Sequence, residues 1–341
     1  MNLASKYRPK TFKDVVAQTY VKEILLNQLE TDSIKHGYLF CGGAGTGKTT
    51  TARIFANDVN KGKGNPIEID AASNNGVENV RNIIEDSRYK AMDSEYKIYI
   101  IDEVHMLSTG AFNALLKTLE EPSSGTLFIL CTTDPQKIPD TILSRVQRFD
   151  FTRIDNDLIV DRLAYIIDSE NEEGCDYSYD REALSFIGKL ANGGMRDSIT
   201  RLEKVLDYES HVSMEAVANA LGVPDYDTFA ELVEAISIYD GTRCLEIVNE
   251  FHNSGKDLKL VTRNFTDFLL DVCKYWLVRN VALTQLPSHF EGKLNEFCEK
   301  LPYDVLLWML EEMNELSGVV KWEPNAKPII ETKLLLMSKE E

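Results

Sequence analysis

The segment GGAGTGKT, residues 42–49, has the residue types and the spacing of a phosphate-binding loop. It matches G-x-x-x-x-G-K-[ST], follows the apolar run YLFCG and precedes a helical pattern. Glycines let backbone N–H groups approach phosphate oxygens without a Cβ clash, and the following helix N-terminus favours an anion. We expect a nucleoside triphosphate to bind here, at Gly42, Gly43, Ala44, Gly45, Thr46, Gly47, Lys48, Thr49 and Thr50.

Two acidic residues supply the second half of this chemistry. In the loop, Lys48 is expected to reach the β- and γ-phosphates and Thr49 to bind Mg²⁺. The apolar run KIYIIDE ends in Asp102 and Glu103, which we expect to hold the Mg²⁺ shell and to polarise the attacking water, respectively. The alternatives are a glycine-rich turn without a ligand and an ordinary polar strand end. The combination of the two motifs favours hydrolysis of the nucleotide.

Three further residues could complete such a site. Thr133 ends the apolar run GTLFILCTT and would lie beside the γ-phosphate if its strand neighbours the strand that ends at Asp102. Arg145 stands at an expected helix end, and Arg196 begins a helix after the glycine-rich break ANGG. On residue type alone, each arginine is either a surface ion pair or a nucleotide contact.

The elements that position these residues alternate between strands and helices as far as about residue 150. This alternation is typical of βαβ units and predicts an α/β fold with a parallel sheet and flanking helices. The segment 131–151 starts as a strand and is expected to continue as polar and then helical structure. We expect strands over 38–42, 67–70, 97–103 and 125–133, and helices over 49–59 and within GAFNALLKTLEEP, residues 110–122.

The remainder of the chain has a helical pattern. The segment LGVPDYD, with its Gly and Pro, marks a boundary, so we expect domains over 1–152, 153–223 and 224–341. An apolar stripe at spacings of three and four residues predicts a helix that packs in a core, with a subunit interface as the alternative. Its members are Leu306, Met309, Leu310, Met313, Leu316 and Val320.

Composition excludes several classes of protein. The 341 residues contain 43% hydrophobic and 27% charged residues, and no run is long enough to span a bilayer. The polar start of the chain does not have a secretory signal, so we expect a cytoplasmic protein without membrane contact. The net charge of −18 argues against nucleic acid covering the whole surface, although a local patch could still bind DNA. The six cysteines form no CxxC pair and imply neither zinc nor disulfides.

Taken together, several segments resemble the gamma/tau subunits of the bacterial DNA polymerase III clamp loader, which are AAA+ ATPases. The resemblance is dense over residues 5–200 and thins beyond about 225. It implies an α/β ATPase domain, a small helical lid and a helical collar that holds an oligomer, with ATP and Mg²⁺ bound. The segments are KYRPKTFKDVVAQ, GGAGTGKTTTARIFA, IEIDAASNNGVENVRNI, KIYIIDEVHMLSTGAFNALLKTLEEP, TTDPQKIPDTILSR and GGMRDS.

The resemblance also assigns roles to individual residues. Lys48, Thr49, Asp102 and Glu103 match the two ATPase motifs, and Thr133 matches the first sensor. Arg145 matches an arginine finger that reaches the ATP of a neighbouring subunit, and Arg196 matches the second sensor on the lid. Tyr7, Arg8 and Pro9 match a segment near the adenine.

The partners that the resemblance implies are a sliding clamp, other loader subunits in a five-membered spiral, and primer–template DNA held by its backbone. Two loops that open helices could offer N–H groups to DNA phosphates, with simple helix capping as the alternative. These loops contain Ser73, Asn74, Asn75 and Gly76 in the first and Ser108 and Thr109 in the second.

Three departures from the family pattern qualify the resemblance. The place of a four-cysteine zinc module holds only KGKGNP, so zinc is not expected. The finger motif reads Ser-Arg-Val where the family has Ser-Arg-Cys, which leaves the guanidinium in place. A long tau-type tail is absent, which indicates a short gamma-like form that would suit a phage-encoded replisome, in the bacterial cytoplasm or in an infected host cell.

We therefore expect an ATP-driven motor subunit that opens a sliding clamp and loads it onto primer–template DNA, without polymerase activity of its own. One alternative is another AAA+ machine, such as a helicase loader or a branch-migration motor, against which the segments KYRPKTF and TTDPQKIP argue. The other is a non-hydrolysing structural subunit of the stator type. The intact Lys48, Thr49, Asp102 and Glu103 favour a working ATPase.

Overall fold

The computed structural model describes residues 2–91, 93–123, 125–222 and 226–339. The chain divides into two compact units, each described here by itself: Met1–Glu173 with Ala191–Glu203, and Gly174–Leu190 with Lys204–Glu341. The predicted domain boundary after residue 152 stays a prediction, and the boundary after residue 223 lies outside the described residues. Among the residues described, no helix combines the length and apolar character needed to cross a membrane.

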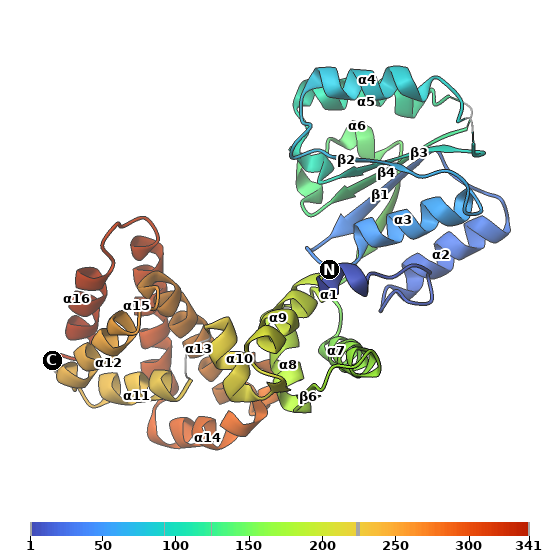
Figure 1. Cartoon of the computed structure of the whole chain (residues 1–341). Helices are drawn as coiled ribbons and strands as arrows, with labels where there is room; N and C mark the ends of the chain where they lie inside the picture. The colour runs from blue at the N-terminus through green and yellow to red at the C-terminus, as the bar shows by residue number, and fades with distance from the viewer. Residues whose placement is uncertain (1, 92, 124, 223–225, 340–341) are drawn as a thin grey trace. The chain divides into compact units, whose positions relative to one another are not determined.

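The first unit is built on a parallel five-stranded sheet with the strand order β2-β3-β4-β1-β5 (Figure 1). The four predicted strands are confirmed within a residue at either end. The fifth strand corrects the expectation of helical structure up to residue 151, because only the single turn α6 precedes it. The strands are β1 Gly37–Gly42, β2 Ile67–Asp70, β3 Lys97–Asp102, β4 Thr126–Thr132 and β5 Gln147–Phe151.

Helices cover both faces of this sheet, because the central strands are apolar on both sides. On β1, Tyr38 and Phe40 pack toward one helical layer, and Leu39 and Cys41 toward the other. The first layer consists of α2 (Thr19–Glu30) and α3 (Lys48–Val59) (Figure 1). The second layer consists of α4 (Val77–Ser87), α5 (Thr109–Glu120) and α6 (Asp140–Leu143). The predicted α/β fold is confirmed.

A helical border completes the first unit. It consists of α1 (Leu3–Lys6), α7 (Asn156–Glu172) and the first part of α9 (Met195–Tyr208). Lys6 Nζ lies 2.7 Å from Glu170 Oε1 and 2.5 Å from Glu173 Oε2, which ties the start of the chain to α7. The ring of Tyr7 meets Tyr165 of α7 edge to face, with 6.4 Å between centroids.

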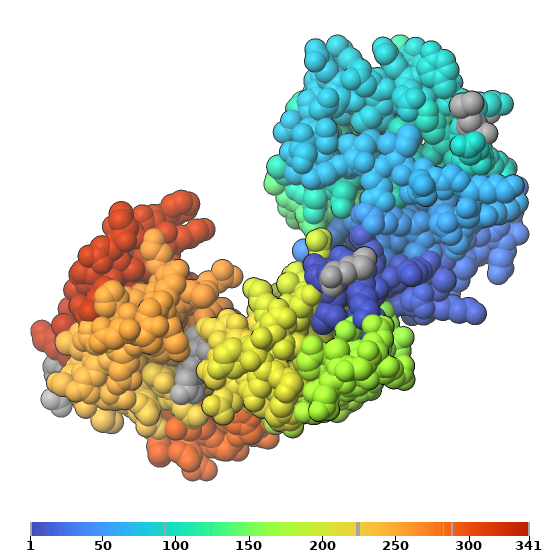
Figure 2. Space-filling view, viewed as in Figure 1, coloured from blue at the N-terminus to red at the C-terminus, as the bar shows by residue number. Residues whose placement is uncertain are grey.

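In the residues of the second unit that the structure describes, one short parallel pair of strands accompanies the helices. Its helices from α11 to α16, coloured yellow-orange to red, pack as one body in the space-filling view (Figure 2). The elements are β6 Ser178–Tyr179, α8 Arg181–Leu190, β7 His211–Val212, α10 Met214–Leu221, α11 Tyr226–Ser237, α12 Gly241–Asn253, α13 Leu258–Val278, α14 Glu291–Lys300, α15 Tyr303–Val320 and α16 Lys327–Met337.

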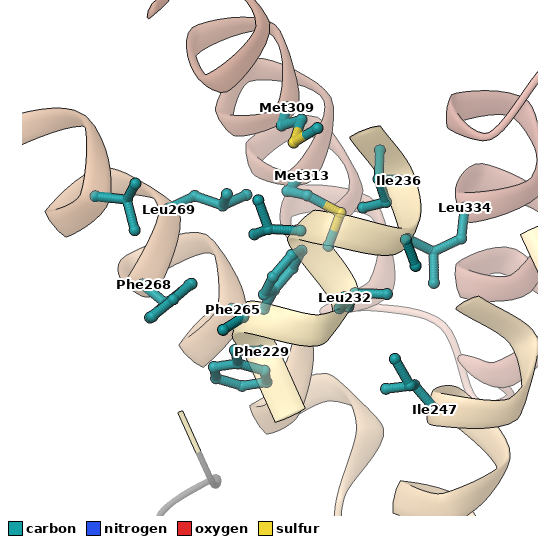
Figure 3. Packing of buried hydrophobic residues seen from close by; sticks show 14 of the residues in the cluster. Phe229, Leu232, Ile236, Ile247, Phe265, Phe268, Leu269, Met309, Met313 and Leu334 are labelled. Carbon is teal, nitrogen blue, oxygen red and sulfur yellow. The ribbon is translucent and has the colours of Figure 1, made fainter. Parts of the chain in front are cut away.

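An aromatic and aliphatic core joins the helices of this second unit. Phe229 of α11 lies against Phe265 and Phe268 of α13, at ring-centroid distances of 5.3 and 5.7 Å (Figure 3). Met309 and Met313 point into the same core from α15 (Figure 3). The methionine-containing stripe is therefore part of the core: Leu310 is partly buried, and the other members are buried.

Helix α16 offers a test of how much this core contributes to stability. Leu334 is 1% exposed and Leu336 is 65% exposed on the same helix. Leu334→Ala should lower the free energy of unfolding of this unit by about 2–5 kcal/mol, because a buried side chain is lost and a cavity remains. Leu336→Ala, the matched control, should change it by less than about 0.5 kcal/mol.

The measurement is urea unfolding followed by tryptophan fluorescence. All three tryptophans, Trp276, Trp308 and Trp322, belong to the second unit, so the signal reports on that unit. Equal shifts of the unfolding midpoint for the two variants would contradict the packing described.

Candidate nucleotide-binding site

The phosphate-binding loop joins β1 to α3 and contains backbone positions that only glycine can occupy. A Cβ on Gly42 would lie 2.4 Å from the carbonyl oxygen of Phe151, at a φ of +150°. Gly45 has a φ of +71°, and a Cβ there would lie 3.1 Å from the Cα of Gly194. The loop is therefore packed directly against β5 on one side and the start of α9 on the other.

The side chain of Lys48 lies inside this loop. It is 6% exposed, and its Nζ donates hydrogen bonds of 2.7 Å to the carbonyl oxygens of Gly42 and Gly43. Burial lowers the pKa of Lys48, while the carboxylates of Glu103 and Asp102 act in the opposite direction. The ammonium group therefore lies inside the curve of the loop.

Thr49 and Asp102 are brought together although they lie on different elements. Thr49 Oγ1, in the first turn of α3, donates a 2.9 Å hydrogen bond to Asp102 Oδ2 at the end of β3. A hydroxyl and a carboxylate at the edge of a phosphate loop form the donor set that Mg²⁺ takes together with nucleotide phosphates. The two predicted metal-binding residues thus fit one Mg²⁺ site.

Glu103 adopts a left-handed backbone conformation, φ 47° and ψ 44°, which residues with a Cβ rarely use. Such strain is typical of functional positions. Its Oε2 accepts hydrogen bonds from the hydroxyl of Thr133 at 2.8 Å and from the Thr133 backbone N–H at 3.3 Å. Strand β4 neighbours β3, which is the condition under which Thr133 is expected to lie beside the γ-phosphate.

His105 also contacts this carboxylate, and sequence reasoning missed it. Its side chain is 11% exposed, and its Nδ1 lies 3.2 Å from Glu103 Oε2 and 3.1 Å from Thr132 Oγ1. The hydrogen bond of Nδ1 is the one with the Thr132 hydroxyl, and the contact with Glu103 Oε2 is an ion pair when the imidazole ring is protonated. A single histidine after an acidic pair has no spacing that distinguishes this role.

The start of α9 approaches the loop from the other side. The backbone N–H of Met195 donates a 3.0 Å hydrogen bond to the carbonyl oxygen of Gly45. The next residue, Arg196, is the second residue of α9 and belongs to the first unit, and its contact with a nucleotide stays a prediction. A Cβ on Gly45 would also lie 3.4 Å from the backbone nitrogen of Arg196.

The N-terminal segment 7–9 lies between α7 and α3. Arg162 of α7 donates a 2.9 Å hydrogen bond to the carbonyl oxygen of Tyr7, and Arg8 Nε donates one of 3.1 Å to Thr50 Oγ1. Burial lowers the pKa of the Arg8 guanidinium, and the nearby guanidinium of Arg53 lowers it further. Burial, followed by the Glu170 carboxylate, raises the pKa of Tyr7 to about 12. The segment therefore touches the loop directly through Arg8.

Gln18 is a second residue that sequence reasoning missed. It is 7% exposed and has a left-handed backbone, with a φ of 57°. Its amide nitrogen donates to the carbonyl oxygens of Thr46, at 3.3 Å, and Thr152, at 2.8 Å, and its amide oxygen accepts from the backbone N–H of Thr152 at 3.2 Å. One side chain thus links the phosphate loop to the residue that follows β5.

Arg145 lies at the end of the sheet where the strands begin, opposite the end that carries this site. A Cβ on Gly37, the first residue of β1, would lie 3.5 Å from the Arg145 carbonyl oxygen, whereas the phosphate loop follows the last residue of β1. At about 3.3 Å per residue, the six residues of β1 separate the two edges by about 17 Å. Arg145 therefore does not reach the phosphate loop of its own chain.

The two candidate DNA-facing loops are adjacent in the structure. The backbone N–H of Ser108 donates a 3.3 Å hydrogen bond to the carbonyl oxygen of Asn75, and the helices that follow, α4 and α5, lie side by side. Gly76 and Ser108 are the N-caps of these helices. The hydroxyl of Ser73 and the amide of Asn74 are bound to Asp70, so those side chains also stabilise the turn.

Zinc ligands do not gather in the described part of the chain, where no group of three or more His, Cys, Asp or Glu side chains is placed to hold a metal. Mg²⁺ has different requirements, because phosphate oxygens and waters supply most of its ligands. The contact between Thr49 and Asp102 satisfies them on the protein side. That zinc is not bound stays a prediction.

Two family models match the chain. Residues 65–155 match the model described as DNA polymerase III, delta subunit, and residues 212–311 match DNA polymerase III subunits gamma and tau domain III. These matches cover β2 to β5 of the sheet and much of the helical second unit.

Curated relatives give the same result over longer stretches. The chain is 36% identical to DNA polymerase III subunit tau of Bacillus subtilis, over 96% of this chain and 62% of that protein. It is 34% identical to DNA polymerase III subunit gamma of Buchnera aphidicola, over 78% of each. The chain spans 54% of the tau subunit of Salmonella typhimurium, so several relatives are considerably longer than this chain.

Among solved structures, the RuvB Holliday junction branch migration motor of Thermotoga maritima is similar. The TM-score is 0.53 at 17% identity, and the match covers 77% of this chain and 90% of that one. At this identity the likeness concerns the fold, which is that of an AAA+ ATPase.

The contact of His105 with Glu103 yields a prediction for turnover of ATP. His105→Leu removes the polar contacts with Thr132 and Glu103, so the turnover number should fall by about tenfold or more, with little change in the dissociation constant of ATP. His105→Asn keeps a polar, hydrogen-bonding group near the position of Nδ1 and should retain most of the rate.

Stopped-flow binding of a fluorescent ATP analogue and steady-state phosphate release separate the two quantities. If the Leu and Asn variants were equally slow, the polar contact of His105 with Thr132 and Glu103 would not be the property that matters.

Proposed function

Because the chain belongs to the family of DNA polymerase III gamma and tau subunits, we propose that it is an ATP-driven motor subunit of a loader for a DNA sliding clamp. The observation that carries this proposal is the pair of contacts between Thr49 and Asp102 and between Glu103 and Thr133. The first pair suits Mg²⁺, and the second suits the attacking water. A purely structural subunit has no need to retain both.

Within the site, each residue has a separate task. Bound Mg²⁺-ATP supplies the reacting phosphoryl group and the metal charge that stabilises it. Lys48 turns from its own loop carbonyls to phosphate oxygens, and Thr49 and Asp102 hold the metal. Glu103 accepts a hydrogen bond from, and so orients, the attacking water, and Thr133 and His105 fix the position of its carboxylate.

The nucleotide is enclosed by two further segments. Arg196 reaches the phosphates from the start of α9, because its helix is already hydrogen-bonded to the loop at Gly45. Tyr7, Arg8 and Pro9 form the base and sugar side, with Arg8 anchored at Thr50. Closure of these segments over the nucleotide excludes water and links the nucleotide state to the position of the lid.

Arg145 completes the site of a neighbouring subunit in this proposal. Its place at the opposite edge of the sheet prevents it from serving its own chain, and a guanidinium at the surface suits the phosphates of an adjacent nucleotide. Hydrolysis then requires assembly, and ATP stabilises the contacts between subunits. The partners are the other loader subunits, arranged in a five-membered spiral, and the clamp.

DNA is proposed to lie along the N-termini of α4 and α5. Two parallel helix starts direct unpaired backbone N–H groups outward, and these bind phosphate without reading sequence. The net charge of −18 and the nearby Asp70 limit the attraction that one subunit exerts. Stable binding therefore depends on several subunits acting together on primer–template DNA.

Two alternatives remain distinct from this proposal. A stator-like subunit would bind without turning over ATP, and the assembled Lys48, Thr49, Asp102 and Glu103 argue against it. A different AAA+ motor on DNA, such as a branch-migration motor, has the same fold, and the family membership argues against that alternative.

The finger proposal predicts complementation between two inactive variants. Lys48→Ala lacks a working site but keeps its finger, and Arg145→Ala keeps its site but lacks the finger. Each alone should hydrolyse ATP roughly a thousandfold more slowly, and a mixture should recover a substantial part of the rate. Arg148→Ala is a matched control, because this exposed arginine pairs with Asp150 of its own chain.

The measurement is the rate of phosphate release as a function of the mixing ratio of the two variants. An Arg145→Ala variant with full activity on its own would contradict a finger supplied by a neighbour.

Clamp loading predicts a specific pattern of stimulation. In the reconstituted complex, clamp and primer–template DNA together should raise the ATPase rate more than either alone, and a four-way junction should not replace the primer–template. Lys48→Ala in every copy of this chain should abolish both the stimulation and the transfer of clamp to DNA. Loading that survives this substitution would support the stator alternative.

A further inference from the structure

A groove that contains several charged side chains lies at the end of the sheet where β1 and β5 begin. Its volume is about 510 Å³, and its lining includes Lys35, His36, Glu120, Ser144 and Arg145. These residues come from the start of β1, the end of α5 and the turn before β5. The groove therefore surrounds the residue that we propose as the finger, and it belongs entirely to the first unit.

Both terminal nitrogens of Arg145 are already occupied by its own chain. Nη1 donates to the carbonyl oxygen of Thr141 at 2.6 Å and to the hydroxyl of Ser144 at 2.9 Å. Nη2 forms an ion pair with Glu120 Oε1. Both N–H groups of Nη1 are thus used within the chain, and the Glu120 carboxylate takes one N–H of Nη2 and offsets the charge of the guanidinium, so a phosphate at Nη2 competes with this carboxylate.

Glu120 is the one carboxylate among the described residues that line the groove. The other charged lining groups are the ammonium of Lys35 and the guanidinium of Arg145, and Lys35 makes no ion pair within the part of the chain that the structure describes. His36 faces the carbonyl oxygen of Thr126 through Nδ1 at 3.3 Å. Without the charge of Glu120, the groove would attract an anion more strongly.

We propose that Glu120 is a positioning residue that holds Arg145 against its own chain and yields it to the nucleotide phosphates of a neighbouring subunit. This inference rests on the proposed function. Glu120 and a phosphate compete for the same nitrogen, so the ion pair weakens the contact that a bound nucleotide makes between subunits. The side chains of Arg145 and Glu120 are 32% and 46% exposed, so water screens the pair and the exchange is easy.

The size of the effect follows from this exposure. Ion pairs that are open to water change an equilibrium by up to about fivefold. Removal of the Glu120 charge should therefore tighten assembly on ATP by about two- to fivefold, and the gain should shrink as salt screens the charges. The fold should not suffer, because Glu120 is an exposed residue at the end of α5.

The chain offers a matched control at the next position. Glu121 is also exposed, and in the described residues its carboxylate makes neither a hydrogen bond nor an ion pair. Glu121→Gln therefore changes the net charge of the chain as Glu120→Gln does, without touching the finger.

The experiment uses finger donors that cannot hydrolyse ATP themselves. Donors carry Lys48→Ala alone, with Glu120→Gln or with Glu121→Gln, and each is titrated into an Arg145→Ala acceptor. The first readout is the donor concentration that gives half of the maximal ATPase rate. The second is the dissociation constant of the donor–acceptor complex, measured by sedimentation with a slowly hydrolysed ATP analogue and again without nucleotide.

With nucleotide, we expect both the half-maximal donor concentration and the dissociation constant to be two- to fivefold lower for the Glu120→Gln donor. The Glu121→Gln donor should match the unmodified donor. Equal behaviour of the two glutamate variants, or weaker activation by Glu120→Gln, would overturn the proposal. Failure of the unmodified Lys48→Ala donor to activate the acceptor would instead contradict the finger proposal itself, so the two failures are distinguishable.

Discussion

A loop that binds phosphate through backbone N–H groups has to be held in shape before the anion arrives, because a free glycine-rich segment would lose that order. In this chain, residues outside the loop hold it in shape. Gln18 binds the carbonyl of Thr46, Met195 binds the carbonyl of Gly45, and β5 approaches Gly42 so closely that no side chain fits. These partners come from distant parts of the sequence. The nucleotide site therefore depends on the complete fold of the first unit.

The parallel sheet gives the two edges of the first unit different chemistry. Side chains after the ends of β1, β3 and β4 converge on the phosphate loop, as expected at the carboxyl edge of parallel strands. The opposite edge presents Arg145 with Glu120. The length of a strand separates the two. In the proposed loader, this separation makes each site depend on a neighbour, so that hydrolysis reports assembly.

Glu103 shows how one side chain can connect the elements of the site. Its strained backbone places the carboxylate against Thr133 of the neighbouring strand end, where two donors meet at one oxygen, and beside the ring of His105. A shift of the β4 end would move this carboxylate. In the proposed ATPase site, the link between the γ-phosphate and the sheet would therefore be short and made of hydrogen bonds.

The sequence predicted the four apolar strands, the phosphate loop and the acidic pair, because buried strands and glycine turns leave local patterns. The sequence did not predict strand β5, because the segment QRFDF is short and about half of its residues are polar. His105 and Gln18 had no pattern at all: single residues of these types have many uses. The position of Thr133 beside Glu103 depended on the order of the strands, and the stripe on α15 could have been core or interface. Only the tertiary structure decided these points, because strand order and the burial of a helix face depend on contacts between residues far apart in the chain, which local periodicity does not record.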